Sequence, residues 1–106
     1  MVNRFDVYLV NLDDRASDDP KNTRPAVVIS PDELNRNVET AIIAPLSSTN
    51  ARYPTRIPVA FLNETRFVIL DQIQTVDRNR LVKKIGELDK NARPVINEKL
   101  QELFAE

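Results

Sequence analysis

The 106-residue sequence contains no histidine, no cysteine and no tryptophan, and its single glycine is Gly86. Without histidine or cysteine, the chain cannot use a thiol nucleophile, a serine–histidine relay or a histidine/cysteine zinc site. Any general acid or base must therefore come from aspartate, glutamate, arginine, lysine or tyrosine. A single glycine also excludes Walker-type loops and dinucleotide-binding fingerprints, because both need several glycines.

Long apolar runs are missing as well. No stretch approaches the ~20 apolar residues that a membrane-spanning helix needs, and the first residues lack the apolar core of a signal peptide. Together with the absence of cysteine, this predicts a cytoplasmic protein. A chain that is 42% hydrophobic and 29% charged is expected to form one soluble domain over residues 1–106.

Charge is uneven along the chain, although the net charge is only −1. Residues 52–84 hold seven bases and three acids, a local charge of +4, whereas residues 1–23 and 87–106 each hold three bases and five acids, a local charge of −2. A basic middle can form a nucleic-acid-binding face if the fold gathers its side chains. A mixed, solvated surface is the alternative interpretation.

Short strands dominate the expected secondary structure. Alternating or continuous apolar and β-branched residues predict six or seven strands, in segments 5–11, 25–29, 40–46, 53–61, 67–70, 73–76 and 81–88. The polar segment 13–22 predicts a long loop, and loops of this length in compact domains are often functional.

Two helices are expected. Ser30–Glu33 fits a capping box, in which the Ser30 hydroxyl bonds the amide of Glu33, and predicts a helical turn through Asn35. A second helix, with Asn91 as N-cap and Pro94 in its first turn, is predicted by an apolar stripe of Val95, Ile96, Leu100, Leu103 and Phe104. The fold class is mainly β with helices: a small, strongly curved antiparallel barrel with a C-terminal helix packed on it.

Six segments follow one another in an informative order, although none is specific alone. They are Arg4–Val10, Thr23–Ser30, Ala44–Ser48, Tyr53–Val59, Leu70–Asp77 and Arg80–Gly86. In this order they resemble the MazF/PemK family of toxin endoribonucleases, from about residue 4 to residue 104. Thr23-Arg24-Pro25-Ala26-Val27-Val28-Ile29-Ser30 is the strongest single match.

The resemblance implies an SH3-like barrel of the PemK/CcdB toxin type, assembled as a homodimer. It implies sequence-specific cleavage of single-stranded RNA without a metal or any other cofactor. It also implies a cognate MazE-like antitoxin, whose disordered acidic tail occupies the RNA groove, and contact with operator DNA only through that antitoxin.

The available side chains suit this chemistry. RNA carries its own nucleophile, the 2′-OH, so an enzyme needs to orient its attack, stabilise charge on the phosphoryl oxygens and assist proton transfer. Arg24 stands where the polar loop enters a buried strand, and its family counterpart is the main catalytic residue. We expect Arg24 to act electrostatically, because a guanidinium stays protonated. A structural salt bridge to an aspartate of the loop is the alternative.

Two further positions carry catalytic expectations from the family. Ser47 matches a threonine that hydrogen-bonds the scissile phosphate, and a loop-capping serine is its alternative role. Asp71 matches an aspartate that serves as the base in the Kid branch, beside a histidine and an arginine two residues earlier. Here the earlier position is Ile69 and no histidine exists. Asp71 is therefore expected to be structural or substrate-orienting rather than a base.

RNA contacts are expected from the loops and strand ends, with ordinary surface roles as the alternative. The candidates are Ser17, Asp18, Asn50, Arg56, Gln72 and Gln74. Many relatives have arginine in place of Gln74, and a Gly-Ser-Glu stretch where this chain reads 16–20 without glycine. Tyr53 and Phe61 are candidates for base stacking, although burial in the core is favoured for Phe61.

Two other functions compete with the ribonuclease. A CcdB-like gyrase inhibitor would share the barrel, but it relies on an extreme C-terminus that usually contains tryptophan. A degenerate family member would only bind the antitoxin and act as a co-repressor, and the residues at Ile69 and Gln74 are the reason to consider it.

Overall fold

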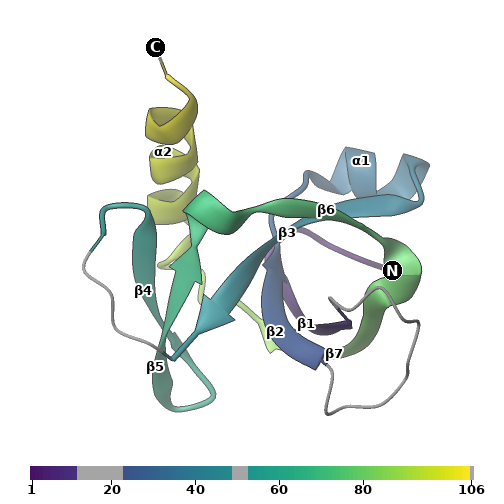
Figure 1. Cartoon of the computed structure of the whole chain (residues 1–106), viewed down its shortest axis with the longest axis horizontal. Coiled ribbons are helices and arrows are strands. Elements are labelled where there is room, and N and C mark those ends of the chain that lie inside the picture. Colours follow the sequence, from purple (N-terminus) through teal and green to yellow (C-terminus); the bar gives the residue numbers. More distant parts are fainter. Residues whose placement is uncertain (12–22, 49–52, 106) are drawn as a thin grey trace.

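The computed structural model describes residues 1–11, 23–48 and 53–105. Seven strands, two α-helices and two short 3₁₀ turns make up this part of the chain (Figure 1). Their order is β1 (Asp6–Asn11), β2 (Thr23–Val28), α1 (Asp32–Asn37), β3 (Thr40–Ser47), β4 (Arg56–Phe61), β5 (Glu64–Ile69), η2 (Leu70–Gln72), β6 (Gln74–Asp77), η3 (Arg78–Arg80), β7 (Leu81–Glu87) and α2 (Arg93–Phe104). The predicted fold class is confirmed.

All seven strands belong to one antiparallel sheet: six follow the order β4-β5-β3-β2-β1-β7, and β6 pairs with β3 off this path. The long strand β3 changes partner along its length, because residues 40–43 pair with β6 and residues 46–47 pair with β5. The sheet curls into an open half-barrel, and no ladder joins β4 to β7 within the described residues (Figure 1). These two edges meet without backbone pairing. The Phe61 ring of β4 packs so closely on Gly86 of β7 that a Cβ added at Gly86 would lie 2.9 Å from the ring.

Strand β2 shows why one predicted segment is apolar throughout. Val27 contributes to a cluster inside the curl, with Leu70, Leu88 and Ile96 among its members. The neighbouring residue Ala26 belongs to a second cluster, on the other face of the sheet. A strand that is covered on both faces needs a continuous apolar run rather than an alternating one.

The predicted capping box is wrong. The N-cap of α1 is Pro31, and no side chain caps the helix, which runs to Asn37. Ser30 is fully buried and bonds Asn35 instead: its hydroxyl donates to the Asn35 side-chain oxygen, and the Asn35 amide donates to the Ser30 carbonyl at 2.9 Å. The Ser30 hydroxyl also accepts from the backbone N–H of Ile42 at 3.1 Å, which ties α1 to β3.

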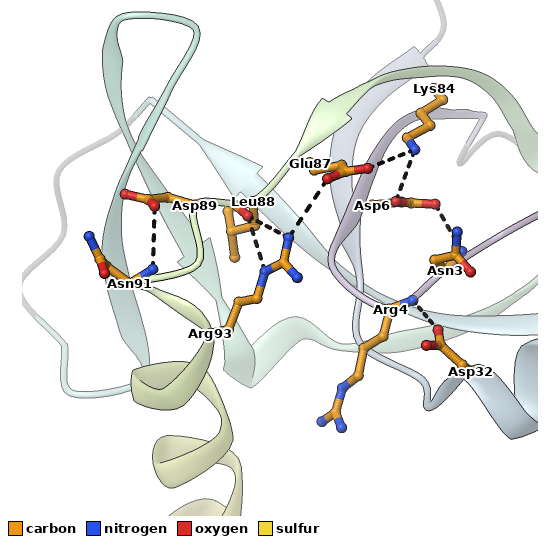
Figure 2. Close-up of polar contacts among 10 residues, drawn as sticks. All are labelled: Asn3, Arg4, Asp6, Asp32, Lys84, Glu87, Leu88, Asp89, Asn91 and Arg93. Carbon is orange, nitrogen blue, oxygen red and sulfur yellow. Dashed lines mark hydrogen bonds and ion pairs between the residues drawn. The ribbon is translucent and has the colours of Figure 1, made fainter.

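Helix α2 confirms the prediction of a C-terminal helix, with two differences. Its N-cap is Ala92 rather than Asn91, whose backbone N–H donates to an Asp89 oxygen at 3.3 Å (Figure 2). The apolar stripe is only partly buried: Ile96 is fully covered and Leu100 packs against the core, whereas the other three residues, Val95, Leu103 and Phe104, are exposed. Figure 1 shows the reason, since α2 rises away from the curled sheet.

Polar contacts hold the N-terminal segment, β7 and α2 together (Figure 2). Lys84 lies 3.2 Å from both Asp6, which is buried, and Glu87. Arg93 donates twice to the Leu88 carbonyl, at 3.0 and 3.2 Å. These contacts fix the base of α2 against the barrel.

None of the helices in the described ranges is long and apolar enough to cross a membrane.

Candidate functional site

An open groove of about 450 Å³ lies where β2 begins and β3 ends. Residues from β5, from η2 and from β6 complete its wall. The lining residues are Arg24, Pro25, Pro45, Leu46, Ser47, Ser48, Arg66, Gln72 and Gln74. Four residues singled out by the sequence therefore share one site: Arg24, Ser47, Gln72 and Gln74.

Arg24 is held at the rim of this groove. Its backbone pairs with Val10 of β1, and the adjacent Pro25 pairs with Leu9, so the strand fixes the position from which the exposed side chain projects. Its one hydrogen bond within the described chain is long, 3.5 Å from Nη1 to the Thr23 carbonyl. No described acid forms an ion pair with it. The guanidinium is placed to receive an anion.

Ser47 stands beside Arg24 because of the β2–β3 register. Ala26 pairs with Pro45, and continuing this antiparallel ladder places Arg24 opposite Ser47. On its other side, Ser47 pairs with Phe67 of β5. The guanidinium and the hydroxyl thus come from adjacent strands of one rigid sheet, an arrangement that can hold two oxygens of a single phosphate.

Asp71 and Arg56 form a separate cluster, and neither lines the groove. The Thr55 hydroxyl donates to Asp71 at 2.9 Å, and the Arg56 Nε lies 3.9 Å from the same carboxylate oxygen. The Arg56 guanidinium also lies over the Tyr53 ring, 5.0 Å from its centre. Asp71 sits in η2, directly before Gln72, so this cluster anchors one wall of the groove.

The remaining sequence candidates have different outcomes. Ser17, Asp18 and Asn50, and the aspartates that could pair with Arg24, lie outside the described residues. Phe61 is only 8% exposed and belongs to the core, as the sequence favoured. Tyr53 is 61% exposed beneath Arg56, so its ring remains accessible from one side.

Sequence reasoning missed Arg66, the second arginine of the groove. The sequence shows it only as one of seven bases in the segment 52–84, next to a predicted strand. Its place in the groove depends on the pairing of β5 with β3, where Ser47 lies opposite Phe67. No local pattern carries that long-range register.

A smaller apolar pocket of about 250 Å³ adjoins the groove. It shares Pro25, Leu46 and Arg66 with the groove. Its other lining residues are Leu9, Phe61, Leu62 and Ile85. Arg66 therefore lies at the boundary between a polar surface and an apolar one.

The fold and the groove define a class of protein: a small curled antiparallel sheet with a C-terminal helix and an open groove lined by Arg24, Arg66, Ser47 and Ser48. Residues 3–104 match the family described as PemK-like, MazF-like toxin of type II toxin-antitoxin system. The chain therefore belongs to this toxin family.

Individual relatives agree with that assignment. Endoribonuclease EndoA of Bacillus subtilis (strain 168) is 32% identical over 107 aligned positions, covering 95% of this chain and 92% of EndoA. Endoribonuclease MazF of Staphylococcus saprophyticus is 33% identical over 104 positions, covering 92% of this chain and 87% of that protein.

Solved structures share the fold. An endoribonuclease in complex with its cognate antitoxin from a mycobacterial species superposes with a TM-score of 0.82 at 22% identity, covering 96% of this chain and 93% of that one. A MazE–MazF structure from Deinococcus radiodurans gives a TM-score of 0.79 at 22% identity, covering 98% and 95%.

Proposed function

We propose that this chain is the toxin of a type II toxin–antitoxin pair and acts as a sequence-specific endoribonuclease on single-stranded RNA, without a metal or other cofactor. The observation that carries the proposal is the meeting of Arg24 and Ser47 in one open groove. The relatives named endoribonuclease, at 32% and 33% identity over most of the chain, support the same activity.

The reaction uses the ribose as its nucleophile. The 2′-oxygen forms a bond to the adjacent phosphorus, the bond from phosphorus to the 5′-oxygen breaks, and the 2′-proton is lost as the 5′-oxygen gains one. The products are a 2′,3′-cyclic phosphate and a 5′-OH. Negative charge builds up on the phosphoryl oxygens during this step, and the site must stabilise it.

Arg24 supplies the main stabilisation. Its fork matches two phosphoryl oxygens, and the strand on which it stands needs no rearrangement to present it. The Ser47 hydroxyl donates to the same phosphate from the neighbouring strand. Both groups act by binding charge, so the step runs without the histidine or cysteine that this chain lacks.

Asp71 acts as a positioning residue. Its carboxylate is engaged by Thr55 and lies near Arg56, which fixes the turn that presents Gln72 to the groove. Gln72 and Gln74, each able to donate and accept, contact the bases of the bound RNA. Ser17, Asp18, Asn50 and Arg56 are assigned to the flanking nucleotides.

Antitoxin binding completes the proposal. A mycobacterial relative and a Deinococcus radiodurans MazF were solved with antitoxins, which supports a MazE-like partner for this chain. We assign its acidic tail to the groove and operator DNA to the antitoxin alone. The working form is a cytoplasmic homodimer.

The test uses purified protein and a long single-stranded RNA in EDTA, beside the variant Arg24→Ala. We expect discrete cuts that persist in EDTA and a cleavage rate that falls about 10²- to 10³-fold in the variant, the usual effect of losing one transition-state donor. Arg36→Ala, an exposed change on α1, is the matched control and should cut normally.

Four other results would count against the proposal. Cutting that stops in EDTA would show that the reaction needs a metal. Cutting by Arg24→Ala at the wild-type rate would move the site elsewhere. No cutting by the wild type would favour the degenerate family member, for which the uncharged Gln74 in the groove is the supporting observation. Inhibition of gyrase without any cutting would favour the CcdB-like function.

A further inference from the structure

Arg66 is the charged groove residue with no role in the proposed reaction. It comes from β5, two strands away from Arg24, and faces the same open space. Continuing the β3–β5 register by one residue past the Ser47–Phe67 pair places Ser48 beside Arg66. Both arginines therefore line one open groove, Arg24 from β2 and Arg66 from β5, and β3 with its Ser47 lies between these two strands.

The Arg66 side chain is held by packing. It is 29% exposed, and it forms part of the wall of the apolar pocket with Leu46 and Leu62. An arginine whose stem covers apolar surface keeps its charged head at the water boundary. Its Nε is buried and has no acceptor among the described residues. The Arg66 guanidinium is thus positioned by packing against apolar side chains rather than by a set of hydrogen bonds.

The Glu64 carboxylate pairs with the Arg66 guanidinium when no ligand is bound. Arg66 Nη2 donates to Glu64 Oε2 at 2.9 Å, and the Glu64 side chain is 65% exposed. Exposed pairs of this kind contribute little to stability, so an arriving anion exchanges with the glutamate at little cost. Most of the donors of the guanidinium stay available for that anion, because this pair uses a single N–H within the described chain.

We propose that Arg66 binds a second RNA phosphate, next to the one cleaved at Arg24, and that Glu64 occupies the guanidinium until RNA displaces it. The inference rests on the proposed function, since it takes RNA to be the occupant of the groove. RNA is favoured because phosphates recur along one strand, so two arginines that line the same open groove can contact different phosphates of one bound strand. An acidic polypeptide is the competing occupant.

The experiment measures binding without cleavage. The probe is a short single-stranded 2′-O-methyl RNA of mixed sequence, which lacks the attacking hydroxyl, and its affinity is followed by fluorescence anisotropy over a range of salt concentrations. Arg66→Ala should weaken binding about 10-fold and reduce the slope of log K against log salt by about 0.7, the loss of one phosphate contact on a single strand. Arg66→Lys should retain most of the slope.

Two further variants sharpen the test. Glu64→Gln removes the competing carboxylate and should raise the affinity about 3-fold. Arg36→Ala on α1 removes the same charge away from the groove and should change neither affinity nor slope. Thermal melting of each variant shows that it is folded before its binding is compared.

The outcomes separate this inference from the proposed function. Normal cutting of ordinary RNA together with wild-type binding by Arg66→Ala would overturn the role of Arg66 alone. Neither cutting nor binding by the wild type would overturn both. If Arg66→Ala weakens binding of poly-glutamate but not of the RNA probe, the residue serves an acidic protein partner, and the RNA assignment is wrong.

Discussion

At the residue scale, the groove depends on side chains whose backbones are fixed by β-ladders. Continuing the β2–β3 register past Ala26 and Pro45 places Arg24 opposite Ser47 on the neighbouring strand. Neither residue needs an unusual backbone conformation to reach the groove. Removing one side chain should therefore remove one interaction and leave the site's frame intact.

Ser47 offers a test of how its hydroxyl acts. Ser47→Ala should lower the cleavage rate about 10- to 100-fold, because one donor to the phosphate is lost. Ser47→Thr should keep or raise the rate, since β-branching restricts the hydroxyl to fewer rotamers. Ser48→Ala is the neighbouring control, with only a small effect expected. Equal rates for Ser47→Ala and wild type would assign Ser47 to a purely structural role.

The sequence identified part of the groove and missed part of it for a physical reason. Arg24 was found because a basic residue between a polar loop and a buried apolar run must lie at a strand entrance, and the family match added its role. Arg66 was missed because its place depends on pairing with β3, about twenty residues earlier in the chain. The engagement of Asp71 by Thr55 likewise depends on contact between separate elements.

At the element scale, the link from α1 to β3 depends on a buried polar pair. Ser30 and Asn35 satisfy each other, and Ser30 also accepts from the Ile42 backbone. The sequence predicted a helix here from a local capping pattern, and the helix exists. The predicted capping box does not form, because the Ser30 hydroxyl bonds Asn35 and the backbone of Ile42 in β3, a contact that a four-residue pattern cannot reveal.

Removing the amide of this pair should destabilise the fold. Asn35→Ala leaves the Ser30 carbonyl without its side-chain donor in a buried site, so we expect the free energy of unfolding to fall by about 1–3 kcal/mol. Urea unfolding followed by circular dichroism measures this change. Asn37→Ala is the matched control: its amide donates to the Glu33 carbonyl on the exposed face, and a change within about 0.5 kcal/mol is expected.

Both variants should leave RNA cleavage unchanged at temperatures where they are folded. Equal stability losses for Asn35→Ala and Asn37→Ala would contradict the structural role assigned to the buried pair.

At the scale of the whole molecule, one cation joins the N-terminal strand to the end of the barrel. Two hydrogen bonds, the more important one to Asp6 and the other to Glu87, raise the pKa of Lys84 above its ordinary value of 10.5. Burial, followed by the nearby Asp6 carboxylate, raises the pKa of Tyr8 above its ordinary value of 10.0. Both groups hold their protons more tightly in the folded protein than in the unfolded chain.

The sign of the resulting pH dependence follows directly. A group whose pKa is raised by folding contributes its full stability below the unfolded pKa and loses it as the pH rises through the folded pKa. Stability should therefore decline above about pH 10, with Lys84 and Tyr8 acting in the same direction. Urea midpoints measured across this range test the decline.

Variants identify the groups responsible. Tyr8→Phe and Lys84→Gln should each flatten the alkaline decline, and Lys84→Gln should also lower stability at neutral pH, because it leaves the buried Asp6 without its cation. Lys83→Gln changes an exposed lysine of the same strand that has no ion pair among the described residues. A decline of equal steepness in all three variants would contradict this account.

The architecture as a whole was the most predictable part of the molecule. Strand and helix periodicities predicted nearly every element, because each pattern is local and the apolar faces must meet in one core. The open edge between β4 and β7 was not predicted, nor was the exposure of Leu103 and Phe104 on α2. Both depend on how elements distant in the sequence meet, as Gly86 of β7 meets the Phe61 ring of β4, and no local pattern carries that information.

The central claim is that the groove at Arg24 promotes attack by the RNA's own 2′-OH. The measurement that tests it most directly is the chemistry of the cut ends, read by mass spectrometry and by 5′-labelling of the products of a short RNA. The account predicts a 2′,3′-cyclic phosphate on one fragment and a free 5′-OH on the other, both formed about 10²- to 10³-fold more slowly with Arg24→Ala. Fragments that carry a 5′-phosphate would mean that water attacks instead, and would contradict it.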